Sequence, residues 1–465
     1  MIKDTVPLSL LRLGAAIMFS AFAFSQQAPL TIDQAVQQAL ARYPSIRVST
    51  EQVSAAAAAI KLARTAYLPR VDFLAQVNRA THNNVFGLLL PQNTLPVISN
   101  VSGPVLGTNS LGNVWGTTVG TLVSWEPFDF GLRDSTVQLA RSAQDVAGAQ
   151  LNVTKLQVAA IAADAFLTIL AAQQTVTAAQ AGVARAKVLD GVVEAQVKSQ
   201  LRPGADASRA RAELALAQTQ LIQAEQAVDV GKAVLAQYLA ETPQSVRLEP
   251  GPLLQPPREP GVLDVPPSQH PLAVVQNAAI EQVKVRERLL DKTYYPRFSL
   301  QGTSYARGTG IQPDGTTGNA ASGLGPNIQN WALGMTVTFP IFDLPSIRAR
   351  KEIERYNERT EAARYDQVVQ DLNGRQEQAK ATLTGALKVA RNTPIQLSAA
   401  RDSVQQAAAR YKAGLSTIVE VAEAQRLLTQ AEIDDALAKL GIWRARLALS
   451  VAQGDLDPFL STAKK

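Results

Sequence analysis

The chain has 465 residues, of which 46% are hydrophobic, 5% aromatic and 18% charged, with a formal net charge of +6. Lysines and arginines are scattered among acidic residues and form no basic patch with interleaved aromatics, which argues against nucleic acid as a partner. The sequence contains no cysteine, so neither disulfides nor a lipid attached to an N-terminal cysteine can stabilise or anchor it.

The N-terminus predicts a secretory signal peptide over residues 1–25. Lys3 and Arg12 precede an uncharged run, Leu13–Phe24, and Ala23-Phe24-Ser25 resembles a small-x-small cleavage site. The alternative, a membrane anchor, is disfavoured because the apolar run is too short to span a bilayer. We expect no later segment to approach a transmembrane helix, so any insertion into a membrane would use β-strands.

The first repeat of the mature chain, residues 26–242, changes from helical to strand periodicity and back. Apolar residues at helical spacing predict helices on both sides of Pro44, and Tyr67-Leu68-Pro69 ends this pattern. Alternating strands and an alanine-rich run of nearly seventy residues follow, and a helix of that length would extend about 100 Å. The predicted elements are strands at about 70–80 and 114–126 around a loop over Thr81–Asn113, a long helix over 133–200 and a return helix over 205–241.

The second repeat, residues 271–456, has the same order of elements. Tyr295-Pro296 corresponds to Leu68-Pro69 at a shift of 227 residues, and Phe342-Asp343 to Phe128-Asp129 at a shift of 214. The difference, 227 − 214 = 13, equals the extra length of the first inter-strand segment, as expected for an exposed loop. The predicted elements are strands at about 297–306 and 331–341, a long helix over 346–413 and a return helix over 416–454, with a proline-rich connector over 243–270 and a tail over 457–465.

Four strands cannot close a barrel, because two open edges in lipid would leave backbone groups unpaired. Three copies would supply twelve strands, an even number in the range of outer-membrane barrels. The expected fold is mainly α with a membrane β-barrel: an internally duplicated chain whose trimer forms a long α-helical barrel and a 12-stranded β-barrel. The alternative for the strands is a soluble sheet with an aromatic core. Aromatic residues expected at the membrane interfaces are Tyr67, Trp125, Phe128, Tyr295, Trp331, Phe339 and Phe342.

The segment from Tyr411 to Val421 resembles the turn between the last two tube helices of the TolC-like outer-membrane efflux proteins. Leu30–Ala35, Tyr43-Pro44, Tyr67-Leu68-Pro69 and Asp206–Arg211 support the resemblance, which covers nearly all of the mature chain. It implies a homotrimer in the outer membrane that extends into the periplasm, with an equatorial region made by the connector and the C-terminus. It also implies the exit duct of a tripartite efflux or type I secretion system. Its partners would be outer-membrane lipid, a periplasmic adaptor protein and an inner-membrane transporter of RND, ABC or MFS type.

The resemblance implies a periplasmic constriction at Glu420 and Glu423, which lie one helical turn apart. Asp206 falls on Glu420 at the shift of 214. TolC itself carries an arginine where this chain has Ser416, and Arg202 of the first turn is the candidate to replace it. The alternative for the acids is an ordinary solvated helix face. The residues expected in the gate turns and the adaptor contact are Arg202, Pro203, Gly204, Tyr411, Gly414, Ser416 and Thr417.

No catalytic constellation is visible in the sequence. The two histidines, His82 and His270, lie in a loop and in the connector, and neither forms part of a Ser/His/Asp arrangement or an HExxH motif. We therefore expect no enzyme activity, no cofactor and no metal site, and the energy for transport would come from a partner. The alternative function is a non-channel structural or adhesive coiled-coil protein of the periplasm or outer membrane.

Overall fold

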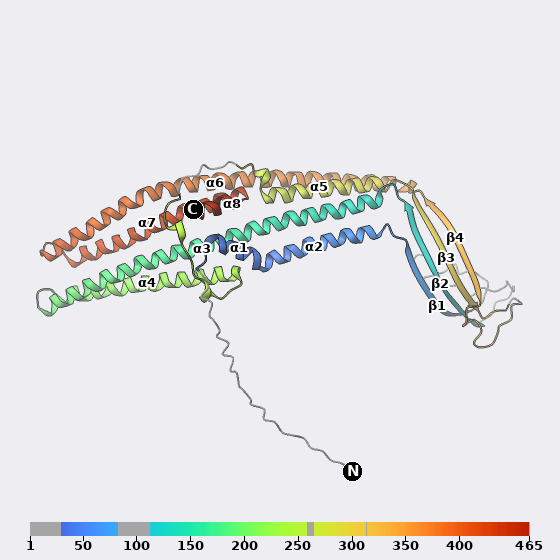
Figure 1. Ribbon diagram of the computed structural model, residues 1–465, viewed down its shortest axis with the longest axis horizontal. Helices are drawn as coiled ribbons and strands as arrows, with labels where there is room; N and C mark the ends of the chain where they lie inside the picture. The colour runs from blue at the N-terminus through green and yellow to red at the C-terminus, as the bar shows by residue number, and fades with distance from the viewer. Residues whose placement is uncertain (1–28, 82–111, 258–264, 313, 465) are drawn as a thin grey trace, which may run out of the picture.

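The computed structural model describes residues 29–81, 112–257, 265–312 and 314–464. The expected signal peptide, His82 and nearly all of the expected loop between the first two strands lie outside the described residues. The molecule is elongated, with a sheet at one end and the turns of the long helices at the other (Figure 1). Its elements are α1 (Ile32–Arg42), α2 (Pro44–Thr65), β1 (Arg70–Thr81), β2 (Asn113–Phe128), α3 (Leu132–Lys198), α4 (Gly204–Leu239), α5 (Pro271–Lys292), β3 (Arg297–Thr309), β4 (Ile328–Thr338), α6 (Leu344–Lys412), α7 (Ile418–Gln453) and α8 (Asp457–Ala463).

The two halves of the chain form matching sets of helices. The long helices α3 and α6 have 67 and 69 residues, and each therefore extends about 100 Å. α3 packs against α2 and α4, and α6 packs against α5 and α7, so each long helix is flanked by two shorter ones in succession (Figure 1). Contacts of α3 with α5 and α7 join the halves. Small side chains such as Ala162 and Ala163, which are 0% exposed, allow the helices to approach closely.

The apolar core lies around the middle of α3. Phe166, Leu167 and Ile169 are fully buried there, in one cluster with residues of α1, α4, α7 and α8. One 18-residue window of α3 has a mean hydropathy of 1.6, so this helix is long and apolar enough to cross a membrane. In length and composition, therefore, the expectation that no later segment approaches a transmembrane helix is wrong. Because 56% of this window is buried inside the protein, its apolar residues are those of a core helix.

The connector and the C-terminus wrap around this core. Leu30 forms a parallel bridge with Leu248, and the Trp443 indole N–H donates to the carbonyl oxygen of Gln255 at 2.9 Å. Part of the segment expected as a tail is helix α8, whose Phe459 belongs to the core cluster. Lys464 forms an ion pair with Asp33 of α1 at 3.0 Å. The C-terminus is therefore part of the packed helical domain.

The four strands form one antiparallel sheet in the order β1-β2-β3-β4. One face is apolar, and the other carries polar residues such as Asp72, Gln76 and Thr303. This alternation is typical of strands with one face toward lipid. Within the described chain, the outer edges of β1 and β4 pair with no other strand. The large side chains of the apolar face that are more than half exposed are Val71, Phe73, Val77, Phe128, Trp331, Leu333 and Met335.

Gly120 of β2 permits the close approach of β3. A Cβ atom at Gly120 would lie 2.3 Å from the Cβ of Tyr305 and 2.7 Å from the carbonyl oxygen of Ser304. We expect Gly120→Ala to force the strands apart and to destabilise the folded protein by about 1–3 kcal/mol, the usual cost of overpacking. Gly334→Ala in β4 is the matched control, because no atom lies within 4 Å of its Cβ position. The measurement is the unfolding midpoint in detergent, and equal midpoints for the two variants would contradict the prediction.

Candidate functional site

Two turns, between α3 and α4 and between α6 and α7, form the end of the molecule remote from the sheet (Figure 1). They end their helices alike: the Leu201 amide donates to the Gln196 carbonyl oxygen and the Leu415 amide to that of Arg410, both at 2.9 Å. The residue before each leucine has a positive φ, 61° at Gln200 and 77° at Gly414. Glycine adopts this conformation without a steric cost and usually ends a helix in this way. The two turns are therefore structural equivalents, related by the shift of 214 residues.

Tyr411 is the centre of a small cluster that joins the two turns. Its side chain is 4% exposed and packs with Leu189 and Val193 of α3. Its hydroxyl donates to the Gln196 side-chain oxygen at 3.2 Å. Burial raises the pKa of the Tyr411 hydroxyl, the nearby Arg202 lowers it and Asp206 raises it, with a net rise. The hydroxyl therefore keeps its proton and remains a donor.

Arg202 reaches from the first turn to the second. Its guanidinium carbon lies 4.7 Å from the centre of the Tyr411 ring, and its Nη2 donates to the Tyr411 carbonyl oxygen at 3.3 Å. Such a cation–π contact contributes about 0.5–2 kcal/mol, depending on its burial. Ser416, which stands where TolC carries an arginine, is 8% exposed, and its hydroxyl has no partner in the described part of the chain. Contact between the turns is thus made by Arg202 with Tyr411, and the Tyr411 hydroxyl has a second partner, Gln196, that was not predicted.

The other predicted turn residues surround this contact. Pro203 and Thr417 are the N-caps of α4 and α7, and neither makes a side-chain capping hydrogen bond. Gly204 is the first residue of α4, and the Asp206 amide donates to the Pro203 carbonyl oxygen at 3.1 Å. Asp206 lies near enough to Tyr411 to influence its charge state, but the Asp206 side chain makes no hydrogen bond or ion pair with the described residues.

The two acids predicted at the constriction have different surroundings. Glu423 forms an ion pair with Arg426, and this hydrogen bond and charge raise the pKa of Arg426. Both residues line a cleft of about 680 Å³ between α3, α4 and α7, together with Glu213. Glu420 is exposed, and its carboxylate has no hydrogen bond or ion pair among the described residues. Glu420 therefore presents an uncompensated charge, whereas the charge of Glu423 is largely balanced within the chain.

Two ion pairs of arginine residues join α3 to α7 between the turns and the sheet. Arg185 of α3 pairs with Glu432 at 2.8 Å and donates to the Thr429 hydroxyl at 2.8 Å. Arg444 of α7 pairs with Asp164 at 3.0 Å. Sequence reasoning missed these residues, because the internal repeat aligns one half with the other and carries no information on which faces of the halves meet.

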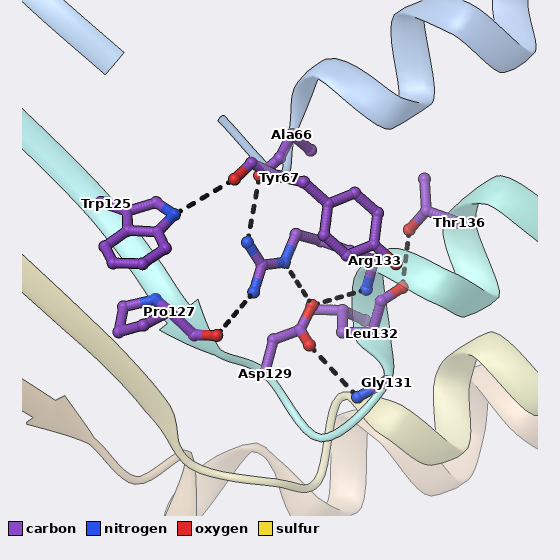
Figure 2. A network of polar contacts seen from close by, with 9 residues as sticks. All are labelled: Ala66, Tyr67, Trp125, Pro127, Asp129, Gly131, Leu132, Arg133 and Thr136. Carbon is purple, nitrogen blue, oxygen red and sulfur yellow. Dashed lines mark hydrogen bonds and ion pairs between the residues drawn. The ribbon is translucent and has the colours of Figure 1, made fainter. Parts of the chain in front are cut away.

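A second polar network lies where the helices meet the sheet (Figure 2). Arg133 of α3 is 9% exposed and pairs with Asp129 at 2.8 Å. It also donates to the carbonyl oxygens of Ala66 and Pro127, both at 3.3 Å, and lies over the Tyr67 ring at 4.8 Å. Burial raises the pKa of Asp129, but the hydrogen bonds from Arg133 and from the Arg133 and Gly131 amides outweigh burial, so this pKa lies below its ordinary value. Arg133 thereby ties the end of α2, the end of β2 and the start of α3 together.

The aromatic residues predicted at the membrane interfaces are all exposed and lie at two levels of the sheet. Trp331 lies in β4 opposite Ser304, toward the end remote from the helices. Trp115, which was not predicted, lies near the same end and has the Arg79 guanidinium 5.2 Å from its ring centre. The six aromatic residues at the helix end of the sheet are Tyr67, Trp125, Phe128, Tyr295, Phe339 and Phe342. Two aromatic levels separated by apolar strands are typical of a membrane barrel.

The described residues contain no group of three or more His, Asp or Glu side chains placed to hold a metal ion.

The sequence matches the family described as outer membrane efflux protein over residues 35–241 and 273–455. No curated protein sequence matches the chain. The structure is similar to the Campylobacter jejuni CmeC outer membrane channel, with a TM-score of 0.71 and 16% identity over 93% of this chain and 89% of that one. It is also similar to the outer membrane protein VceC from Vibrio cholerae (TM-score 0.70, 15% identity, 91% and 96% covered). A third similarity is to the open state of the Neisseria gonorrhoeae MtrE outer membrane channel (TM-score 0.68, 18% identity, 91% and 89% covered).

Proposed function

The chain belongs to the outer membrane efflux protein family, and from this membership we propose how it assembles, where it closes and what it binds. As a member of this family it is an outer-membrane efflux channel and not an enzyme, with its helical part extending into the periplasm. A non-channel structural or adhesive role is not favoured. The proposed assembly is a homotrimer that serves as the exit duct of a tripartite efflux or type I secretion system.

The open edges of the sheet are the observation that carries this assembly. β1 and β4 have unpaired outer edges, and unpaired backbone groups are costly in lipid. Pairing β4 of one copy with β1 of the next satisfies both edges, and three copies close a barrel of twelve strands. Exposed apolar side chains on the outermost helices, such as Ile222 of α4 and Ile395 of α6, support a second contact between copies. Twelve tube helices then surround the periplasmic duct.

The periplasmic gate is proposed at the two turns. Arg202, Tyr411 and Gln196 hold the turns of one copy together, and Arg202 takes the role of the arginine that TolC carries at the position of Ser416. In a trimer, Glu420 occurs three times around the mouth, and a ring of uncompensated carboxylates favours cations there. Glu423 contributes less because Arg426 neutralises it.

The adaptor contact is proposed at the exposed surface of the same turns. Leu201 and Leu415 are 73% and 71% exposed and occupy equivalent positions. They present an apolar surface beside Pro203, Gly204, Gly414 and Thr417 at the end of the duct, where a periplasmic adaptor would meet it. The inner-membrane transporter beyond the adaptor, of RND, ABC or MFS type, would supply the energy.

Single-channel conductance of the reconstituted protein tests the channel and its gate. We expect a protein of three copies in detergent and a low-conductance, cation-preferring pore. Glu420→Ala should lower the cation-to-anion permeability ratio by about twofold or more, because it removes a ring of three charges. Glu423→Ala is the matched control and should have the smaller effect. Equal selectivity in the unmodified protein, Glu420→Ala and Glu423→Ala would show that the gate does not lie at these acids. Folded trimers without conductance would contradict the channel function.

A further inference from the structure

His270 lies where α7 ends and α5 begins. Its side chain is 4% exposed and caps the N-terminus of α5, since its Nδ1 accepts a hydrogen bond from the Leu272 amide at 3.1 Å. Its Nε2 lies 3.2 Å from the carbonyl oxygen of Val451 in the last turn of α7. An accepting Nδ1 requires the proton of the neutral ring to be on Nε2, which then donates to Val451. The neutral imidazole therefore satisfies an N–H at the start of one helix and a C=O at the end of another.

The junction around this ring is tightly packed. Gly454 ends α7 with a φ of 84°, and a Cβ atom there would lie 2.8 Å from the His270 Cδ2 and 2.6 Å from the Pro271 Cδ. Gln376 of α6 donates to the carbonyl oxygens of Val265 and Ala452, at 3.2 and 3.4 Å. The ring can therefore change its hydrogen bonds only if α7 moves relative to α5.

Among the described residues, no carboxylate contributes a stabilising charge to the His270 ring. Arg375 of α6 faces the same cleft, and Asp164 of α3 is engaged by Arg444 of α7. Asp455, just beyond α7, accepts a hydrogen bond from the Asp457 amide. Burial lowers the pKa of His270, the bond to Val451 raises it and the charge of Arg375 lowers it, with a net value below the ordinary 6.5. The neutral form is the one that fits the packing of this junction.

The equivalent junction of the first half is not built in this way. At the shift of 227 residues His270 corresponds to Tyr43, whose ring stacks on Tyr238 at 4.5 Å between ring centres. Tyr43 precedes α2 without a side-chain capping bond. A titratable imidazole therefore lies at the end of α7, and within the described residues the equivalent position at the end of α4 is occupied by the Tyr43 ring instead.

We propose that neutral His270 is a positioning residue that fastens the end of α7 to the start of α5, and that protonation of its ring releases α7 and favours opening of the turns. A protonated Nδ1 is a donor and cannot accept from the Leu272 amide, so the helix cap and the contact between the helices fail together. α7 is a continuous helix from this junction to the turn that carries Glu420, so its release can reach the turns. The link to opening rests on the gate proposed above, whereas the junction itself does not.

Two readouts test the junction and the gate separately. His82→Asn leaves His270 as the single histidine of the chain, so an imidazole NMR titration reports on it alone. In that protein, hydrogen exchange of the last turn of α7, corrected for intrinsic rates, should accelerate as the pH falls below about 6.5, by at most about tenfold per pH unit for one proton. Because the pKa of His270 is lower in the folded than in the unfolded state, the unfolded state binds the proton more readily. The stabilisation by the neutral ring is therefore complete above about pH 6.5 and is lost as the pH falls through the pKa of the folded state.

His270→Asn in the His82→Asn background is the matched variant. The asparagine oxygen can still cap the Leu272 amide, but it does not titrate. We expect the pH dependence of exchange at the end of α7 and of channel opening to disappear. An unchanged pH dependence, or a ring already protonated at neutral pH, would overturn the proposal. If His270→Asn does not fold, the proposal is tested by hydrogen exchange in His82→Asn alone. Faster exchange of the last turn of α7 below about pH 6.5 supports it, and exchange that does not depend on pH in this way overturns it. Loss of the exchange effect in His270→Asn with no conductance in any protein would support the junction and contradict the proposed channel.

Discussion

Replacing Arg133 by methionine should lower the free energy of unfolding by about 3–5 kcal/mol, the cost of removing one partner of a buried ion pair. The change would leave the partly buried Asp129 carboxylate without its counter-charge and would remove the donors to the carbonyl oxygens of Ala66 and Pro127 (Figure 2). It would also remove the cation from the face of Tyr67. Urea unfolding in detergent, followed by circular dichroism, measures the effect.

Two comparisons separate this network from an ordinary ion pair. Lys198→Met on the same helix removes an exposed pair with Glu194, at 3.1 Å, and should cost less than about 1 kcal/mol. Asp129→Asn combined with Arg133→Met should cost less than the sum of the two single changes, because the partners are coupled. If Arg133→Met and Lys198→Met had the same midpoint, the network would not hold the helices to the sheet.

Replacing Tyr411 by alanine should open the pore. Truncation of a fully packed aromatic side chain costs about 3–5 kcal/mol, and this side chain also provides the ring under Arg202 and the donor to Gln196. If about 3 kcal/mol of that cost falls on the closed arrangement alone, the ratio of open to closed channels rises by about a hundredfold. Single-channel recordings would show the change as a higher open fraction and a larger mean conductance.

The control for this variant is Tyr356→Ala, on the same helix α6 but 57% exposed. It should leave the recordings unchanged. Tyr411→Phe removes only the hydrogen bond to Gln196 and should have a small effect, on the order of 1 kcal/mol. Equal open fractions for Tyr411→Ala and Tyr356→Ala would show that the contact between the turns does not keep the channel closed.

The predicted family, function and outer-membrane location are confirmed by the match to the outer membrane efflux protein family. The resemblance depended on local features, such as the turn that contains Gly414 and the breaks at Pro44 and Pro69. The C-terminal residues were predicted less well. In the segment 457–465, Phe459 and Leu460 are buried against helices that lie far away in the sequence, so a short segment read by itself did not reveal that packing.

Periodicity, turns and the internal repeat were readable because each depends on neighbouring residues. A period of two or 3.6 shows which face of a strand or helix is apolar, and a residue with positive φ ends a helix wherever that helix packs. Tertiary structure alone decided the partners of the polar side chains. Arg185 and Glu432 are 247 residues apart in the sequence, and the Tyr411 hydroxyl donates a hydrogen bond to Gln196 in the other half of the chain. Such pairs depend on which helix faces meet and at what axial offset, and this is set by packing along the whole length of α3, α6 and α7.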